Sequence, residues 1–290
     1  MVAASTSSWL SFSGVMLTTF GPAAVLIKTV IAPQPDLIIL AILAAFAWLM
    51  VISCVAIVWL ALVPLRDTMW LLVVYGVLAQ EAGRYGTYRV YQRLLRGLDK
   101  VGLKPTIRAG GESVSSQLVA AVPPAIACGV GVGLAQTVIM YGDFLLASLK
   151  PGTLYNPSCR ALSEFALDAI CSLAMLVLNV LLTLLGWTWA YPLQPRGASR
   201  AARMAMVVGL HWLASGSTML NGAGPIAGLD GCALALPCLL ATVALAGWLT
   251  WHAATTGMRG VRGTSTQRAH GETAEGIALE GGRRPTERLE

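Results

Sequence analysis

Long stretches without a charged side chain are the dominant feature of this sequence. Residues 116–142 are 27 consecutive residues without a charge, and residues 37–63 and 169–193 are equally free of charge. A helix needs about 20 such residues to cross the hydrocarbon core of a bilayer. Only 12% of the residues are charged, against about 25% in an ordinary soluble domain. The sequence therefore predicts an all-α, polytopic membrane protein without a soluble domain.

Hydropathy predicts seven transmembrane helices. The third is the weakest, because Gln80, Glu81 and Arg84 interrupt it. Residues 1–257 are expected to form the transmembrane domain. Residues 258–290 are rich in Gly, Arg, Glu and Thr, a composition typical of disorder, and are predicted to be a disordered cytosolic tail. The predicted spans are 9–31, 37–63, 69–88, 116–142, 169–193, 204–221 and 232–256.

The basic residues predict how the chain is oriented. Of 20 Lys and Arg residues, only Arg66, Lys150 and Arg160 belong to the side that carries the N-terminus. Because basic residues concentrate in cytoplasmic loops, the N-terminus is predicted to be lumenal or extracellular and the C-terminus cytosolic. The net charge of +6 is then explained by loops that meet anionic membrane lipids, and no nucleic-acid partner is expected.

Small side chains recur every four residues in the fourth span, at Ala121, Ala125, Gly129 and Gly133. This spacing places them on one face of a helix. In lipid, small residues allow two helix backbones to approach closely. We expect this small-residue stripe to dock a helix of an assembly partner. The sequence does not show whether the docked helix belongs to a partner or to this chain.

Two polar stripes point to buried contacts between the late helices. His211, Ser215 and Thr218 share one face of the sixth span, and Asn179 and Thr183 share one face of the fifth. Polar groups inside a membrane usually face the bundle interior. We expect the two faces to meet and exchange hydrogen bonds. The alternative is a serine protease with Ser215 as nucleophile and His211 as base, but no G-x-S-x-G motif is present.

Gln80, Glu81 and Arg84 are the remaining buried polar candidates. Glu81 and Arg84 are one turn apart, and this spacing predicts a mutually neutralising pair near a helix end. The alternative is a solute transporter or channel that uses Glu81, Arg84, Gln136 and His211 as pathway residues.

The sequence predicts no catalytic, cofactor or metal site. With three histidines in the chain, an H-E-x-x-H motif is absent. The cysteines form no tight metal-binding cluster. Only Cys159 and Cys232 lie near the same predicted lumenal surface, where a disulfide could form.

Several short segments, taken in order, resemble the anterior pharynx-defective family of gamma-secretase subunits. The resemblance rests on the order of the segments over most of residues 10–257. The matching segments are Phe20-Gly21-Pro22-Ala23, Leu78-Ala79-Gln80-Glu81 with Arg84-Tyr85, Gly129 and Gly133 followed by Asp143, Val207 to His211, and Ala214-Ser215-Gly216.

The resemblance assigns expected roles to some of these residues. It implies that Gly129 and Gly133 match two of three glycines used in assembly with presenilin, with Ala125 in the place of the first. It also implies that His211 matches one member of a histidine pair. Leu182 occupies the position of the other member, and Asn179 is the nearest polar substitute.

For the whole chain, the resemblance implies a non-catalytic scaffold in the gamma-secretase complex. Its partners would be nicastrin, presenilin, which brings the catalytic aspartates, and the presenilin enhancer subunit. The substrates of the complex would be stubs of type I membrane proteins. The chain would reside as a multi-pass protein in the endoplasmic reticulum, Golgi, endosomes or plasma membrane.

Overall fold

The structure is a computed structural model of the chain. It describes residues 2–62, 68–101, 114–150, 155, 159, 162–192, 199–222 and 230–280. Within these ranges, the side chains of residues 2–8, 69, 114–119, 222 and 256–280 are not described. The predicted loop positions Arg66 and Arg160 lie outside the described residues.

The described chain is helical, as predicted. Its elements in order are α1 (Val2–Leu26), η1 (Ile27–Ile31), α2 (Pro35–Ala61), α4 (Met69–Lys100), α5 (Val114–Ala147), α6 (Glu164–Leu185), η3 (Gly186–Ala190), α7 (Arg200–Met219), η4 (Leu220–Gly222) and α8 (Gly231–Glu280). The predicted tail begins beyond Thr255, the last residue whose side chain is described. Residues 258–280 of the predicted tail belong to the last part of α8, without described side chains, and the prediction that the tail is disordered stays a prediction.

Local sequence signals mark where several helices begin. Pro35 is in the first turn of α2 and Asp36 follows it, the residue types that suit a helix N-terminus. The hydroxyl of Ser163 accepts a hydrogen bond from the amide of Ala166 at 3.3 Å and caps α6. Ser199 caps α7 in the same way.

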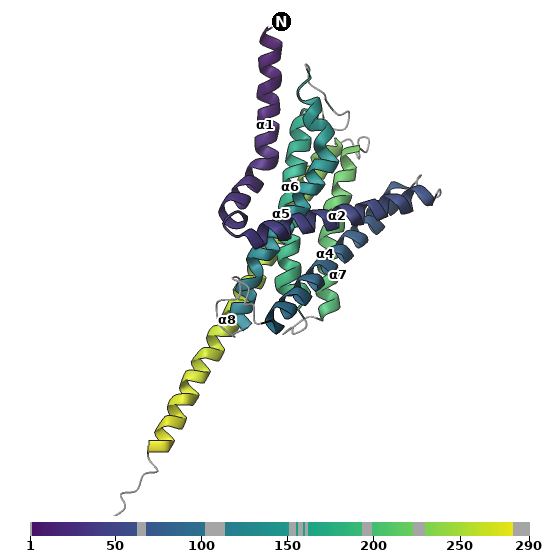
Figure 1. Cartoon of the computed structure of the whole chain (residues 1–290). Helices are drawn as coiled ribbons and strands as arrows, with labels where there is room; N and C mark the ends of the chain where they lie inside the picture. The colour runs from purple at the N-terminus through teal and green to yellow at the C-terminus, as the bar shows by residue number, and fades with distance from the viewer. Residues whose placement is uncertain are drawn as a thin grey trace, which may run out of the picture.

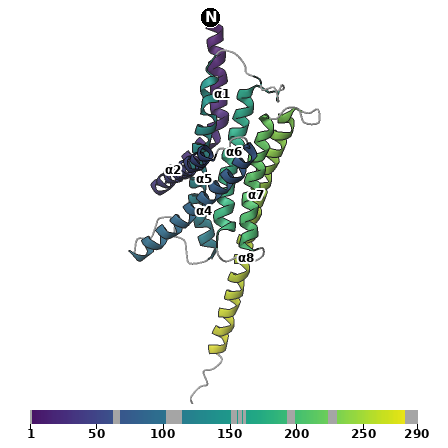
Figure 2. The same ribbon diagram turned by 90° about the vertical axis from the view of Figure 1, so that its right-hand side faces the viewer.

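Helix α5 is central to the bundle. It packs along α6 on one side and α2 on another, while α8 packs against α6 and α7, and α4 against α2 and α7. Figure 1 shows α5, α6 and α7 running in the same general direction, with α2 and α4 crossing them obliquely. The view in Figure 2 confirms the oblique course of α2 and α4. The N-terminal end of α1 and the last part of α8 project from opposite ends of the bundle (Figure 1).

Five of the described helices are long and apolar enough to cross a membrane. They contain the stretches Trp9–Ile31, Pro35–Ala61, Ala120–Ala147, Glu164–Ala190 and Gly231–Thr255. The other two predicted spans exist as helices α4 and α7, but neither is among the helices that are apolar enough by this measure. Seven crossings and the orientation of the termini therefore stay predictions.

Candidate functional site

A buried ion pair on α4 lies in the interior of the bundle. The Nε atom of Arg84 donates to Oε1 of Glu81 at 3.2 Å. Each of the two residues is only 6% exposed. The pair was predicted, but its place near a helix end was wrong. The carboxylate and guanidinium instead face the neighbouring helices. Protein atoms bond to the guanidinium and to Oε1 of Glu81 in place of water, whereas Oε2 of Glu81 is buried without a hydrogen-bond partner among the described residues.

The Arg84 guanidinium bonds to α6. It donates to the backbone oxygen and to Oδ1 of Asn179, each at 2.9 Å, and to the hydroxyl of Thr183. Asn179 in turn donates to Oε1 of Gln136 on α5 at 2.7 Å. A planar guanidinium with several donors suits such a site, where a lysine ammonium would not reach all the acceptors. One cation thus connects α4 to α6, and Asn179 extends the connection to α5.

Glu81 connects the same ion pair to α7. Oε1 of Glu81 lies 2.6 Å from Nδ1 of His211, and His211 is 1% exposed. The expectation that the polar stripes of α6 and α7 bond to each other was therefore wrong. The α4 side chains separate them, because Arg84 takes the Asn179 stripe and Glu81 takes His211. We call the six residues Glu81, Arg84, Gln136, Asn179, Thr183 and His211 the polar core.

The two other polar residues of α7 do not join the polar core. The hydroxyl of Thr218 donates to the backbone oxygen of Ser215 at 2.8 Å, within its own helix. The Nδ1 atom of His211 bonds to Glu81, and among the hydrogen bonds of the described residues none joins His211 to the hydroxyl of Ser215. The structure therefore shows no contact between the base and the nucleophile of the serine-protease alternative.

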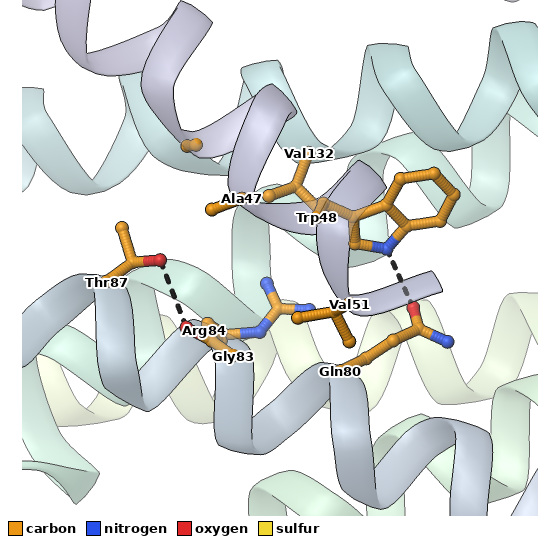
Figure 3. Close-up of a pocket in the computed structure, with 9 residues that line it drawn as sticks. Ala47, Trp48, Val51, Gln80, Gly83, Arg84, Thr87 and Val132 are labelled. Atoms are coloured by element: carbon orange, nitrogen blue, oxygen red, sulfur yellow. Dashed lines mark hydrogen bonds between the residues drawn. The ribbon is translucent and has the colours of Figure 1, made fainter. Parts of the chain in front are cut away.

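Gln80 faces α2 instead of the polar core. Its Oε1 atom accepts a hydrogen bond from the indole of Trp48 at 3.0 Å, which joins α4 to α2. A small cleft lies beside this contact, and Figure 3 shows Val51, Gly83 and Arg84 lining it. The cleft brings together residues of α2, α4 and α5, among them Val132. Sequence reasoning did not predict that Trp48 bonds to Gln80, because the position of a tryptophan in the sequence does not indicate which acceptor its indole N–H will reach.

The small-residue stripe packs against α6 of the same chain. A Cβ atom on Gly129 would lie 2.6 Å from the Cα of Val180, and one on Gly133 would lie 3.1 to 3.3 Å from atoms of Leu176. Ala125 is fully buried, and Ala121 is partly buried. The stripe does dock a helix, as predicted. The docked helix is α6 of this chain, one of the two possibilities that the sequence left open, and α6 leaves no room for another backbone at Gly129 and Gly133.

Gly131 makes a second close contact that sequence reasoning missed. A Cβ atom there would lie 2.1 Å from the backbone oxygen of Ala41 on α2. The signal was present as three glycines at alternate positions, Gly129, Gly131 and Gly133. Alternate residues point to different sides of a helix. The three glycines therefore allow close packing against two helices, with α6 on one side of α5 and α2 on the other.

Leu182, where the resemblance implies a histidine, is fully buried. It belongs to the main apolar cluster together with Leu178 and Leu185. Asn179, the nearest polar residue, is in the polar core one turn earlier on α6.

Cys159 and Cys232 form a disulfide bond. The bond joins a residue that precedes α6 to the second residue of α8. The pairing that the sequence left open is thus present in the structure.

The polar core has the chemistry of a structural site. The guanidinium of Arg84 donates hydrogen bonds from all three of its nitrogens. Oε1 of Glu81 lies within hydrogen-bonding distance of Nε of Arg84 and Nδ1 of His211. Among the described residues, no three His, Cys, Asp or Glu side chains are grouped to hold a metal ion. The arrangement can hold four helices in one register.

Comparison with known proteins gives a consistent relationship. The sequence pattern of the Aph-1 protein family matches residues 10–254. The chain is 25% identical over 241 residues to the gamma-secretase subunit APH1-like of Arabidopsis thaliana, which covers 80% of this chain and 88% of that protein. It is 29% identical over 178 residues to the gamma-secretase subunit Aph-1b of Danio rerio, covering 58% of this chain and 65% of that protein. It is 39% identical over 90 residues to the gamma-secretase subunit Aph-1 of Drosophila melanogaster, covering 31% of this chain and 37% of that protein. A match across most of the sequence, together with helices that suit a bilayer, identifies the chain as an integral membrane protein that belongs to the Aph-1 family.

Proposed function

We propose that this chain is a non-catalytic scaffold subunit of a gamma-secretase complex. In this role it holds presenilin and nicastrin by helix packing, together with the presenilin enhancer subunit, and it supports cleavage of type I membrane proteins. Relatives named as gamma-secretase subunits support the proposal. So does the resemblance of its polar and glycine segments to that family.

The polar core is the observation that carries the proposal. Its ionisable groups, which would be the obvious candidates for chemistry, bond to side chains and backbone of neighbouring helices. A hydrogen bond between membrane helices contributes about 0.6 kcal/mol on average. Breaking a buried ion pair by removing one partner costs far more, about 3–5 kcal/mol. The polar core therefore favours one rigid arrangement of α4, α5, α6 and α7, which is the property a scaffold requires.

Partner helices are proposed to dock on outer faces, since α6 fills the small-residue stripe. Helix α2 has a strongly apolar outer side, where Ile39, Ile42 and Phe46 are each more than half exposed. Helix α8 presents Trp248 and Trp251 in the same way. We assign subunit contacts to these faces and a packing role to the stripe.

Seven crossings with a lumenal N-terminus belong to the same proposal. Two observations support them. The ends of α1 and α8 project from opposite ends of the bundle (Figure 1). The Cys159–Cys232 disulfide suits the side that faces an oxidising compartment. We place the complex in the endoplasmic reticulum, Golgi, endosomes or plasma membrane.

Co-purification tests the proposal most directly. The full chain, tagged and isolated from its native membranes in mild detergent, should recover proteins of the presenilin and nicastrin families in mass spectrometry. The chain purified without partners should neither cleave a peptide nor move a solute when it is placed in liposomes. Cleavage or flux by the isolated chain, or recovery of none of these partners, would contradict the proposal. Flux would favour the transporter alternative.

A variant separates a structural role from a catalytic role. We expect Glu81→Gln to lower the amount of assembled complex without changing the protease activity per assembled complex. Arg96→Gln, an exposed change on the same helix, is the control and should leave both quantities unchanged. Full assembly of the Glu81→Gln complex with lost activity would assign Glu81 to the chemistry instead.

A further inference from the structure

Three arginines gather where the second half of α4 meets the first turn of α7. Arg89 comes from α4, and Arg200 and Arg203 come from α7. The two α7 residues are three positions apart and therefore share one face of that helix. The first turn of α7, which carries them, lies at the end of the bundle opposite the N-terminus of α1 (Figure 1).

Arg89 and Arg200 converge on one oxygen atom. The hydroxyl of Tyr85 accepts a hydrogen bond from Arg89 at 2.8 Å and another from Arg200 at 2.6 Å. Both guanidinium groups also lie over the Tyr85 ring, 5.7 and 5.3 Å from its centroid. Two cations that share a neutral acceptor repel each other, and the phenol supplies no negative charge to offset the repulsion.

Arg203 is the buried member of the cluster. It is 5% exposed and donates from one terminal nitrogen to the backbone oxygen of Trp189. Its Nε and second terminal nitrogen are buried and have no hydrogen-bond partner among the residues that the structure describes, and the same holds for Nε of Arg200. Buried guanidinium N–H groups without an acceptor are costly. The side chain is therefore held in place with two of its nitrogens unsatisfied.

No carboxylate of the described residues balances these charges. None of the described Asp and Glu residues forms an ion pair with Arg89, Arg200 or Arg203. Arg200 is also the first residue of α7, where the helix dipole disfavours a cation and favours an anion. The cluster thus has an excess of positive charge and unused donors at one place.

We propose that Arg89, Arg200 and Arg203 bind the phosphate group of an anionic phospholipid. A phosphate oxygen accepts hydrogen bonds from several guanidinium groups at once, and arginine forks match its geometry. The location favours a lipid over a soluble anion. On α4 beside Arg89, Val90 and Leu94 are more than half exposed and offer an apolar surface to an acyl chain. Tyr85 and Trp189 provide the aromatic side chains that are typical of a membrane interface.

Titration of a fluorescent phosphatidylserine tests this site. The full chain with its co-purifying partners is held in mild detergent, and phosphatidylcholine with the same acyl chains is the reference lipid. We expect clear preference for phosphatidylserine. Arg200→Gln should weaken its binding about tenfold, since it removes a charge-assisted hydrogen bond. Arg93→Gln and Arg96→Gln remove the same charge from exposed positions on α4 and should change binding less than about twofold, because exposed charges are screened.

Each other outcome overturns the proposal in a defined way. Equal loss of binding in Arg96→Gln would show diffuse charge attraction without a site. Competition by inorganic phosphate at the same concentration as the lipid would assign the site to a soluble anion. Loss of a partner subunit in Arg200→Gln with unchanged lipid binding would assign it to an acidic protein segment. Arg89→Gln, at an exposed position, repeats the test should Arg200→Gln fail to elute as a single species in size-exclusion chromatography.

Discussion

Arg84 is the side chain on which the interior of the bundle most depends. Its guanidinium contacts Glu81 on its own helix and Asn179 and Thr183 on α6. Replacement by a neutral residue leaves the Glu81 carboxylate and the Asn179 acceptors buried without their donor. The free energy of unfolding is therefore sensitive to this one residue, even though a buried ion pair by itself adds little net stability.

We predict that Arg84→Gln lowers the free energy of unfolding by about 3–5 kcal/mol. Arg84→Lys should recover only part of the loss, because an ammonium group cannot donate to all the acceptors at once. Thermal unfolding of the detergent-solubilised chain, followed by size-exclusion chromatography, measures the effect. Arg96→Gln is the control and should change stability by less than about 0.5 kcal/mol. Equal melting temperatures for Arg84→Gln and Arg96→Gln would show that the polar core is not structurally required.

The contact between Trp48 and Gln80 allows a smaller and separate prediction. Trp48→Phe and Gln80→Leu each remove one partner of a 3.0 Å hydrogen bond. In a double-mutant cycle we expect a coupling energy of about 0.6 kcal/mol, the average for such bonds between membrane helices. The free energies of unfolding of the wild type, both single variants and the double variant provide the measurement. A coupling energy of zero would mean that the bond does not persist in the bilayer.

At this scale, the sequence could predict which residues are buried and polar, but not their partners. The one-turn spacing of Glu81 and Arg84 predicted their pairing, because helix geometry alone determines it. The contacts of His211 with Glu81 and of Arg84 with Asn179 connect residues 130 and 95 positions apart. Such contacts depend on the way the helices pack. The stripe pattern shows which face of a helix is polar, but it does not show which helix lies opposite.

Among the helices, α5 makes the closest contacts, and its glycines explain why. The backbone of α6 passes so near Gly129 that an added Cβ would lie 2.6 Å from the Cα of Val180. Close backbone approach increases dispersion contacts and weak Cα–H···O bonds, which stabilise helix pairs in lipid. The period of four correctly predicted a docking face. It could not distinguish α6 from a helix of a partner, since both would need the same small residues.

We predict that Gly129→Ala destabilises the chain by about 1–3 kcal/mol, because α5 and α6 must move apart to admit the methyl group. Gly142→Ala on the same helix is the matched control. A Cβ there meets no atom within 4 Å, and alanine should be neutral or stabilise α5 by up to about 1 kcal/mol. Thermal unfolding of the isolated chain distinguishes the two variants. If the Gly129→Ala chain is as stable as Gly142→Ala but no longer co-purifies with its partners, the stripe would have a direct role in docking a partner helix.

For the molecule as a whole, the sequence predicted the helical class and the approximate position of every described helix. The two predicted spans that are not apolar enough to count as candidate membrane helices in the structure, α4 and α7, contain the ionisable residues of the polar core. These charges lower the hydropathy of both helices, although the structure buries Glu81, Arg84 and His211. Hydropathy adds up residues without regard to their partners. A helix whose charges are neutralised inside a bundle therefore scores as more polar than the surface it presents to lipid.

The disulfide provides a test of the orientation of the whole chain. We predict that Cys159 and Cys232 face the lumen and that the end of α4 near Gly97 faces the cytosol. The test uses a variant without the four free cysteines, Cys54, Cys128, Cys171 and Cys238, in sealed microsomes treated with a membrane-permeant reductant. A membrane-impermeant maleimide should label Cys159 and Cys232 only after detergent opens the vesicles.

In the same background with both disulfide cysteines replaced by Ser, Gly97→Cys should be labelled in sealed vesicles, because Gly97 is exposed and lies in the basic half of α4. Between these two positions the chain must then cross the bilayer an odd number of times, and among the described residues α5 is the only helix that lies wholly between Gly97 and Cys159. Labelling of both positions from the same side would mean that α5 does not span the membrane, and the seven-crossing arrangement would have to be abandoned.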